Sequence, residues 1–481
     1  MPEFEWTLLG PILLVTVLAL IILCIDIVRP ENRGRLAAYT ALVGTALAIG
    51  LTLDLWGAEP RHGFGGMIIL DNFALFFNLI FMAGTGLTLF VSSSYLEREG
   101  AARTEYYVLI LTATVGMMLM AAGGDLIVIF LGLEMMSISL YILVGFLRGQ
   151  VRSNEASMKY LLLGAFATGF LLYGIALIYG STGTTNLREI ELAITQGRVN
   201  GQPILLSGVA LLMVGFAFKV GAAPFHMWAP DVYEGAPTAV TAFMSAGPKA
   251  AAFAGFFRIL FVAFRPLSDE WGGAIWVLAA ITMTVGNLGA LSQRNIKRML
   301  AYSSVAHAGY VLVALAAANE KGITGGLFYL FAYTFMNIGA FAVVVAVGRK
   351  GEENLEISNY AGLGFRHRGL ALAMTLFMVS LSGLPPTAGF FGKFTIFSAA
   401  IESGLVWLTI IGVLNSLISV YFYLGVVVSM YMRQPVGETP EIVLSPFARA
   451  ALVVTCAATL YIGLVPSGIL QMARETISSL M

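Results

Sequence analysis

Apolar stretches long enough to cross a lipid bilayer follow one another along almost the whole chain. Each reaches about 20 residues, the length that the hydrocarbon core requires of a helix. In lipid each stretch must be helical, because no backbone polar group can stay unpaired there. The chain is therefore predicted to be an all-α polytopic membrane protein with about fourteen transmembrane helices, at residues 7–28, 36–55, 72–94, 105–122, 126–147, 157–180, 203–223, 237–263, 271–292, 297–318, 323–347, 369–400, 404–431 and 447–465.

The connections between these helices carry further signals. The glycine-rich residues 56–70 predict a short external hairpin, residues 186–197 a short surface helix, and residues 466–481 an amphipathic tail. When the loops are assigned alternately to the two sides of the membrane, one side holds fifteen basic residues and the other six. Because basic residues mark the cytoplasmic side, both termini are predicted to lie outside the cytoplasm.

A faint internal repeat divides the chain. Residues 133–144 align with 302–313, and Lys219 stands five residues before Pro224 as Ser380 stands before Pro385. Two five-helix blocks carry these matches, each with a proline-broken helix, and an odd helix number inverts the second block. Inverted repeats with broken helices are typical of transporters. The predicted parts are an N-terminal three-helix segment, the two repeats, and a C-terminal helix with its tail, at 1–103, 104–265, 266–432 and 433–481.

Composition supports the membrane assignment and excludes several kinds of function. The chain is 58% hydrophobic and 11% charged with a net charge of zero, whereas soluble domains are about 25% charged. A neutral chain has no basic surface for nucleic acid. Its two cysteines exclude iron–sulfur clusters and a disulfide framework. It also has neither a dinucleotide-binding fingerprint nor a phosphate-loop lysine, which argues against hydride transfer and ATP hydrolysis.

Ionisable residues inside the apolar stretches are the candidate functional groups. Glu134 lies in the middle of its predicted helix, where a carboxylate costs roughly 2.5–3.5 kcal/mol on insertion scales. Lys219 precedes Pro224, and Lys393 follows the pair Pro385-Pro386. Proline breaks a helix and frees carbonyl groups that water can solvate, so both lysines are predicted to be buried and yet reachable by protons.

Four other positions extend this set. Lys249 follows a proline inside its helix, and His307 lies among serines and alanines that leave room for water or for another helix. Lys159 and Lys297 lie near helix ends, where they could be relay groups or topology anchors. Arg258, one turn from a helix end, is predicted to be an interfacial anchor.

Together these residues predict proton transfer without a cofactor. The sequence shows neither a serine–histidine–acid set nor a metal-binding cluster, whereas one acid, several lysines and a histidine can all exchange protons. Movement of Glu134 relative to Lys219 is predicted to switch the lysine between holding and releasing a proton. Asp231 and Glu234, in a proline- and glycine-rich loop, are interpreted as structural or as a proton-uptake surface.

The segment KVGAAPFHMWAPDVYEGAPTAVTAFMSAGPKAAAFAGFFRIL at 219–260 closely resembles the signature of the N subunits of bacterial respiratory complex I, the NADH–quinone oxidoreductase. The resemblance continues through the Pro-Pro-Thr-Ala-Gly-Phe-Phe-Gly-Lys stretch that ends at Lys393 and covers about residues 70–435. It implies an antiporter-like fold of fourteen helices in two inverted halves. It also implies that Glu134, Lys219, Lys249 and Lys393 occupy proton-path positions, and that Lys159, Lys297 and His307 match polar positions of the central axis.

The resemblance further implies where this chain works. We expect a bacterial inner-membrane protein with both termini on the periplasmic side, packed in the lipid bilayer against other complex I membrane subunits, including sister antiporter-like subunits. NADH, FMN, iron–sulfur clusters and quinone would then belong to partner subunits, with no cofactor in this chain. Two alternatives stay open: a subunit of a multisubunit sodium/proton antiporter, and a structural membrane scaffold whose charges only hold helices together.

Overall fold

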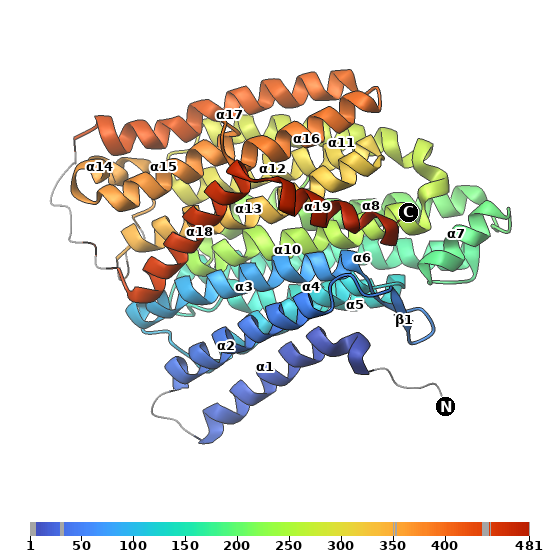
Figure 1. The fold of residues 1–481 in the computed structure, drawn as a ribbon, viewed down its shortest axis with the longest axis horizontal. Helices are drawn as coiled ribbons and strands as arrows, with labels where there is room; N and C mark the ends of the chain where they lie inside the picture. The colour runs from blue at the N-terminus through green and yellow to red at the C-terminus, as the bar shows by residue number, and fades with distance from the viewer. Residues whose placement is uncertain are drawn as a thin grey trace.

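A computed structural model describes residues 6–28, 33–349, 351, 354–434, 442 and 444–480. Within them, 13 helices are long and apolar enough to cross a membrane. Figure 1 shows most of them running side by side in one bundle. They are α1 (Gly10–Val28), α2 (Arg33–Asp54), α3 (Asn72–Glu99), α4 (Thr104–Ala122), α5 (Leu126–Val144), α6 (Val151–Thr182), α8 (Gln202–Val220), α10 (Thr238–Arg258, continued by a π-helical turn Ile259–Ala263), α11 (Ser268–Leu291), α12 (Ile296–Ala317), α13 (Glu320–Val347), α17 (Val406–Met432) and α18 (Pro446–Leu464).

The remaining predicted span, 369–400, is divided in two. Helices α15 (Arg368–Ser382) and α16 (Ala388–Glu402) have 15 residues each, so neither crosses a bilayer alone. The prediction of about fourteen spans is therefore met by thirteen helices and one broken pair. A similar break follows α8, before the short helix α9 (Trp228–Gly235).

Glycine and proline together make both breaks. Gly221 and Gly383 end α8 and α15 with φ of 75° and 84°, the left-handed conformation that glycine adopts without steric cost. Pro224 and Pro385 follow within a few residues and cannot continue a helix because they lack an N–H donor. The sequence spacing that predicted the breaks thus has a local backbone cause.

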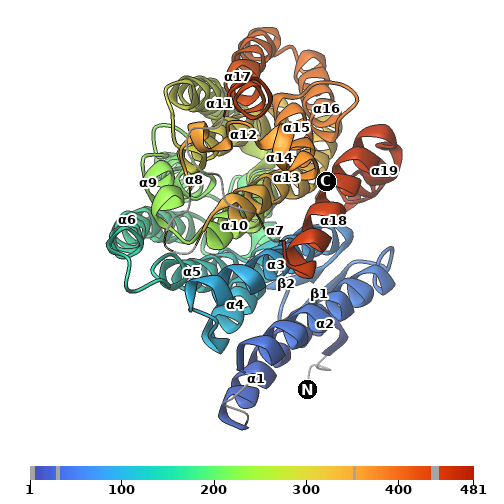
Figure 2. The ribbon, with the colours of Figure 1, turned by 90° about the vertical axis from the view of Figure 1, so that its left-hand side faces the viewer.

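The helices differ strongly in how far neighbours cover them. Figures 1 and 2 place α1 and α2 at one edge of the bundle and α17 at the opposite edge. In α10, α12 and α13, 94%, 89% and 89% of the most apolar 18-residue window is buried, against 33% in α1, α6 and α17. Polar side chains on the three central helices therefore lie away from lipid and must find partners inside the protein.

The predicted hairpin and surface helix are both present. Strands β1 (Arg61–Gly63) and β2 (Ile68–Leu70) pair antiparallel, with Arg61 opposite Leu70. Helix α7 (Leu187–Thr195) lies on the same side of the bundle (Figure 1). The chain's tail forms the short helix α19 (Ser467–Glu475), which packs against α13.

A short helix also lies in the connection before α15. Helix α14 (Leu363–Arg366) leads into α15. The inversion of one five-helix block relative to the other remains a prediction from the sequence. Arg29 and Lys350, two of the basic residues that entered the topology prediction, lie outside the described residues, as do residues 1–5.

The prediction that Arg258 is an interfacial anchor is wrong. Its side chain is fully buried and forms a two-pronged ion pair with Asp71, with Nη2–Oδ1 at 2.8 Å and Nη1–Oδ2 at 2.9 Å. Its Nε donates to the carbonyl of Ala121 at 2.9 Å. The partner carboxylate lies 187 residues earlier, so the position of Arg258 near a helix end gave no sign of the pairing. The arginine ties α10 to the start of α3 and the end of α4.

Candidate functional site

Lys219 lies in the last turn of α8, buried just before the first break. Its Nζ donates to the hydroxyl of Ser137 at 2.8 Å and lies 3.5 Å from that of Tyr141. Both residues belong to α5, where Glu134, Ser137 and Tyr141 follow at spacings of three and four and so share one helix face. The lysine of one helix therefore meets a polar stripe on another.

Glu134 is less enclosed than the sequence predicted. It is partly exposed, and its Oε1 accepts a hydrogen bond of 2.7 Å from Thr168 of α6. Among the described residues no carboxylate lies within 4 Å of the Lys219 ammonium. Glu134 and Lys219 are thus near one another along the stripe without a direct ion pair, and their predicted energetic coupling stays a prediction.

Lys249 follows Pro248 inside α10 and reaches α12. Its Nζ donates to the carbonyl of Ser304 at 2.6 Å and to the hydroxyl of the same serine. The Ser304 hydroxyl also lies 3.5 Å from that of Tyr233 in α9. All of these groups are buried. Both of the hydrogen bonds that the Lys249 ammonium donates therefore go to one serine of α12.

His307 lies on α12 within a group of tyrosines. Its Nδ1 contacts the hydroxyl of Tyr329 on α13, and its Nε2 lies 2.9 Å from the hydroxyl of Tyr423 on α17. The Tyr423 hydroxyl contacts the hydroxyl of Ser303 as well. The sequence led us to expect small neighbours and space around this histidine. Instead, tyrosine hydroxyls from two other helices contact both of its ring nitrogens.

Lys393 lies buried on α16, just after the second break. Its Nζ donates to the carbonyls of Leu381 and Ser382 at 3.1 and 3.0 Å, and to the hydroxyl of Ser416 on α17 at 3.0 Å. Leu381 and Ser382 end α15, whose last carbonyls have no partner within the helix. The ammonium also lies 4.6 Å from the ring centre of Tyr310. It therefore caps the negative end of the half-helix that precedes it.

The sequence search missed the tyrosines, although the internal repeat contained a signal for Tyr141, Tyr310 and Tyr329. The alignment of 133–144 with 302–313 pairs Tyr141 with Tyr310. In the structure Tyr141 lies beside Lys219, and Tyr310 lies beside Lys393. The same repeat pairs Tyr160 with Tyr329 through the match of 159–161 with 328–330. Tyr423 carries no such mark, because α17 brings it to His307 from far along the chain.

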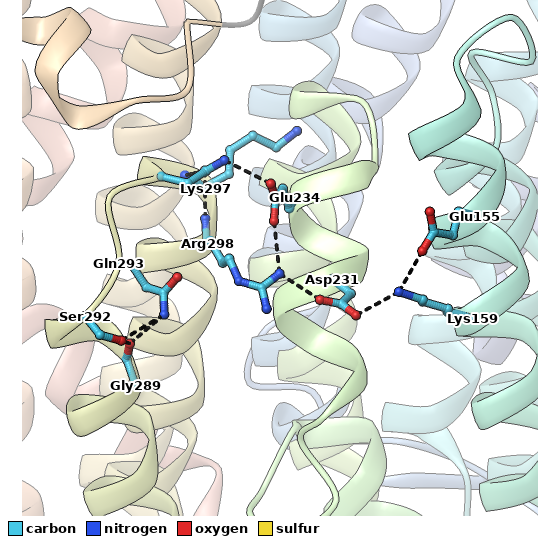
Figure 3. A network of polar contacts seen from close by, with 10 residues as sticks. Glu155, Lys159, Asp231, Glu234, Gly289, Ser292, Gln293, Lys297 and Arg298 are labelled. Atoms are coloured by element: carbon cyan, nitrogen blue, oxygen red, sulfur yellow. Dashed lines mark hydrogen bonds and ion pairs between the residues drawn. The ribbon is translucent and has the colours of Figure 1, made fainter.

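A separate ionic network joins three elements at the side of the bundle opposite the hairpin. Figure 3 shows Lys159 of α6 between Glu155 and Asp231, at 2.8 and 2.9 Å. Arg298 of α12 bonds Asp231 at 2.7 Å and Glu234 at 3.0 Å (Figure 3). We call these five residues the ionic network.

Asp231 is the centre of this network. Partial burial acts to raise the pKa of Asp231, but hydrogen bonds from Arg298 and Lys159 outweigh it and hold the pKa below its ordinary value. Lys297 lies beside the network and is buried, with its Nζ donating to the carbonyl of Ala236 at 2.7 Å. Lys159 and Lys297 are therefore held near the start of their helices, apart from the group formed around His307.

The chemical groups of this arrangement are suited to moving protons. Hydroxyl and imidazole groups can both accept and donate hydrogen bonds, whereas carbonyls only accept. The structure brings together Lys249, Ser304, His307 and the tyrosines of α13 and α17 in one buried cluster. Over the described residues no group of three or more histidine, cysteine, aspartate or glutamate side chains could hold a metal ion.

Comparison with known proteins gives one consistent family. Residues 123–419 match the family model described as NADH:quinone oxidoreductase/Mrp antiporter, TM. The chain is 53% identical to NADH-quinone oxidoreductase subunit N of Trichlorobacter lovleyi, over 97% of this chain and 96% of that protein. It is 44% identical to subunit N 2 of Roseiflexus castenholzii, over 99% and 97% of the two chains.

Solved structures agree with these matches. A chain of respiratory complex I from Thermus thermophilus, solved with bound aureothin, is 35% identical with a TM-score of 0.81, over 96% of this chain and 98% of that one. A chain of the Mrp complex from Dietzia sp. reaches a TM-score of 0.88 at 22% identity, over 99% and 98% of the chains. The second likeness concerns the fold alone.

Proposed function

The chain belongs to the family of NADH-quinone oxidoreductase N subunits within the wider antiporter-like family, and from that premise we propose that it translocates protons as a membrane subunit of complex I. Its neighbours in the bilayer are then other membrane subunits of that complex, including sister antiporter-like chains. The chain contributes to the overall reaction of NADH with quinone by moving protons. Its own residues carry out no redox step.

The observation that carries this proposal is a set of four buried ionisable side chains inside the bundle. Three lysines and a histidine lie on α8, α10, α12 and α16, and their exposed fractions are only 3–7%. Ionisable groups are costly inside a membrane and commonly mark ion pathways. Their partners are hydroxyl and carbonyl oxygens, so each ammonium can lose its proton without leaving a carboxylate unpaired.

We assign the residues to successive parts of one path. Lys159 and Lys297 lie toward the side on which the loops carry most basic residues, which we propose to be the cytoplasmic side of the bacterial inner membrane, with both termini on the other side. Glu134 and Lys219 form the first station, Lys249 and His307 the second, and Lys393 the last. NADH, FMN, iron–sulfur clusters and quinone are assigned to partner subunits.

Replacement of Lys249 by methionine tests the proposal. Methionine keeps most of the volume of the side chain but cannot bind a proton. In inverted membrane vesicles containing the assembled complex, the number of protons moved per NADH oxidised should fall steeply. Lys321→Met is the matched control, because Lys321 bonds Ser398 at 2.6 Å and ion-pairs with Glu402 at the side of the bundle. An unchanged ratio in Lys249→Met, with the complex assembled, contradicts the proposal.

The two alternatives have weaker support. A sodium/proton antiporter subunit is supported by the fold of the Mrp chain, which is 22% identical, and by the family model, whose description covers both kinds of protein. The relatives from Trichlorobacter lovleyi and Roseiflexus castenholzii, at 53% and 44% identity, are both named as subunit N. A pure scaffold predicts that apolar residues can replace Glu134 and Lys219 together without loss of pumping, as buried ion pairs often can be replaced. The same vesicle assay with that double variant separates the scaffold from the relay.

A further inference from the structure

The outside of the bundle has a groove that is suited to binding a ligand. It lies between α17 and the adjoining ends of α11 and α12 and encloses about 1000 Å³. Its wall on α17 is an apolar stripe that includes Leu417, Tyr421 and Val428. Leu417 and Tyr421 are 69% and 75% exposed. The buried cluster around His307 does not line this groove, so the groove is separate from the proposed proton path.

The groove has the length of one membrane leaflet. Leu417 and Val428 are eleven residues apart on α17, which corresponds to about 16 Å at the helical rise of 1.5 Å per residue. The hydrocarbon core of a bilayer is about 30 Å thick, so one leaflet measures roughly half of that. An acyl chain that runs from the membrane surface to its middle therefore matches the stripe.

Charged side chains gather at one end of this groove. Arg294, which precedes α12, and Arg433, which follows α17, both line it. Within the described residues neither guanidinium has an ion-pair or hydrogen-bond partner. Glu356 lines the same end, so the three groups together carry a net charge of +1. The end with the charges lies on the side of the bundle where most basic loop residues are found.

We propose that this groove binds an anionic phospholipid, with its phosphate between Arg294 and Arg433 and one acyl chain along α17. Guanidinium groups bind phosphate oxygens through paired N–H donors, and basic pockets between transmembrane helices bind anionic head groups. The net positive charge favours a phosphatidylglycerol-type lipid over a zwitterionic one. The lipid would fill the groove between α17 and the adjoining ends of α11 and α12.

Photo-crosslinking tests the charge requirement. The assembled complex is placed in nanodiscs of phosphatidylcholine that contain a trace of photoactivatable phosphatidylglycerol, and labelled peptides are identified by mass spectrometry. Labelling of α17 should exceed that by photoactivatable phosphatidylcholine. In Arg294→Gln/Arg433→Gln it should fall at least about fivefold for each charge removed, the ratio expected for one basic residue facing an anionic lipid. The control Arg366→Gln/Arg368→Gln removes two exposed arginines that do not line the groove.

A second variant tests the shape of the groove. A Cβ added at Gly425, which lines the groove, meets no atom within 4 Å, so Gly425→Trp can fill the groove without disturbing the fold. Gly169→Trp on the exposed side of α6 is the matched control, because its Cβ also meets no atom within 4 Å. Only Gly425→Trp should abolish phosphatidylglycerol labelling of α17.

Three results would overturn the proposal. Equal labelling by the two lipids would show that the charges do not select the head group. Equal loss in the two double-arginine variants would show a general attraction to the surface. Crosslinks from α17 to a helix of a neighbouring subunit, with lipid labelling absent, would show that a protein covers the groove. Native gels of every variant establish that the complex is assembled in each case.

Discussion

The two broken helices hold their lysines in different ways. Lys219 precedes its break and donates to hydroxyls on α5, a separate helix. Lys393 follows its break and donates mainly to carbonyls at the end of α15, the other half of its own broken helix. Since a hydroxyl can pass a proton on and a carbonyl cannot, Lys219 is suited to exchange with a neighbouring helix, whereas Lys393 is suited to hold a charge until Ser416 or water accepts its proton.

The helices that the internal repeat aligns share one residue beside the lysines and differ in another. Tyr141 and Tyr310 are aligned, and each lies beside the lysine of its own half. Glu134 is aligned with Ser303, so only the first half has a carboxylate at that position. The two halves of the predicted repeat therefore share the tyrosine beside the lysine and differ in the acid.

Loss of Lys219 should have the largest effect. Lys219→Ala removes the buried lysine at the first break, and proton pumping per NADH should fall to about a tenth or less, in line with the contribution of a positioned acid–base group. Proton uptake by inverted vesicles measures it, with a native gel as the check on assembly. Normal pumping yield would remove the proposed role of Lys219.

Lys393→Arg should lower proton pumping less than Lys219→Ala does, but still clearly. Its effect should be at least as large as that of Lys393→Gln. Arginine keeps the charge that caps α15 but does not release its proton at physiological pH. We expect pumping to fall to about a fifth, with assembly intact, because charge alone is insufficient at a relay site. If Lys393→Arg pumps normally while Lys393→Gln does not, Lys393 serves only as a counter-charge and the second half has no proton station there.

The sequence was informative about the fold because lipid enforces simple rules. Apolar length gave the spans, and proline after glycine gave the breaks at Gly221 and Gly383. Local rules could not give contacts between distant segments. The pairing of Arg258 with Asp71 and the enclosure of His307 by Tyr329 and Tyr423 depend on helix packing. The lysines could be found because a charged residue is rare within an apolar stretch. Tyrosines are common in apolar helices, so their positions alone do not indicate a function.

A double-mutant cycle sharpens the comparison of the two halves. Glu134→Gln should lower pumping about threefold, and combining it with Lys219→Ala should cost much less than the sum of both, because coupled neighbours are not additive. Glu134→Gln combined with Lys393→Gln should be close to additive. Vesicle pumping in the four variants of each cycle measures the coupling. Strong coupling of Glu134 to Lys393, with none to Lys219, would reverse the assignment of stations.

Tyr423→Phe tests the second half without touching a charge. It removes the hydroxyl that contacts both His307 Nε2 and Ser303 while keeping the ring in place. We expect pumping to fall about two- to threefold, consistent with the loss of a hydrogen bond in the relay. Tyr461→Phe is the control, since Tyr461 lies on α18, outside the groove, and is 62% exposed. Equal activity of the two variants would exclude Tyr423 from the path.

Asp231→Asn should have the smallest effect on proton pumping. It tests whether Asp231 links the two halves structurally. Asp231 accepts hydrogen bonds from Lys159 of the first half and Arg298 of the second. Its pKa is lowered in the folded protein, so its charge stabilises the fold above the pKa of the unfolded chain, and this contribution is lost as pH falls through the lower folded value. Half-exposed ion pairs contribute about 0.2–1 kcal/mol each.

We therefore expect Asp231→Asn to lower the thermal midpoint of the complex by a few degrees at neutral pH, with pumping nearly unchanged. The difference from the unmodified complex should shrink as pH falls toward the ordinary aspartate range, because the unmodified protein then begins to lose the same charge. Calorimetry at several pH values measures it, and Glu402→Gln, which breaks the ion pair of Lys321 within the second half, is the control. A large loss of pumping in Asp231→Asn with an unchanged midpoint would instead add Asp231 to the proton path beside Lys159, as part of an uptake surface, and the two halves would then share an acid that the repeat alignment does not show.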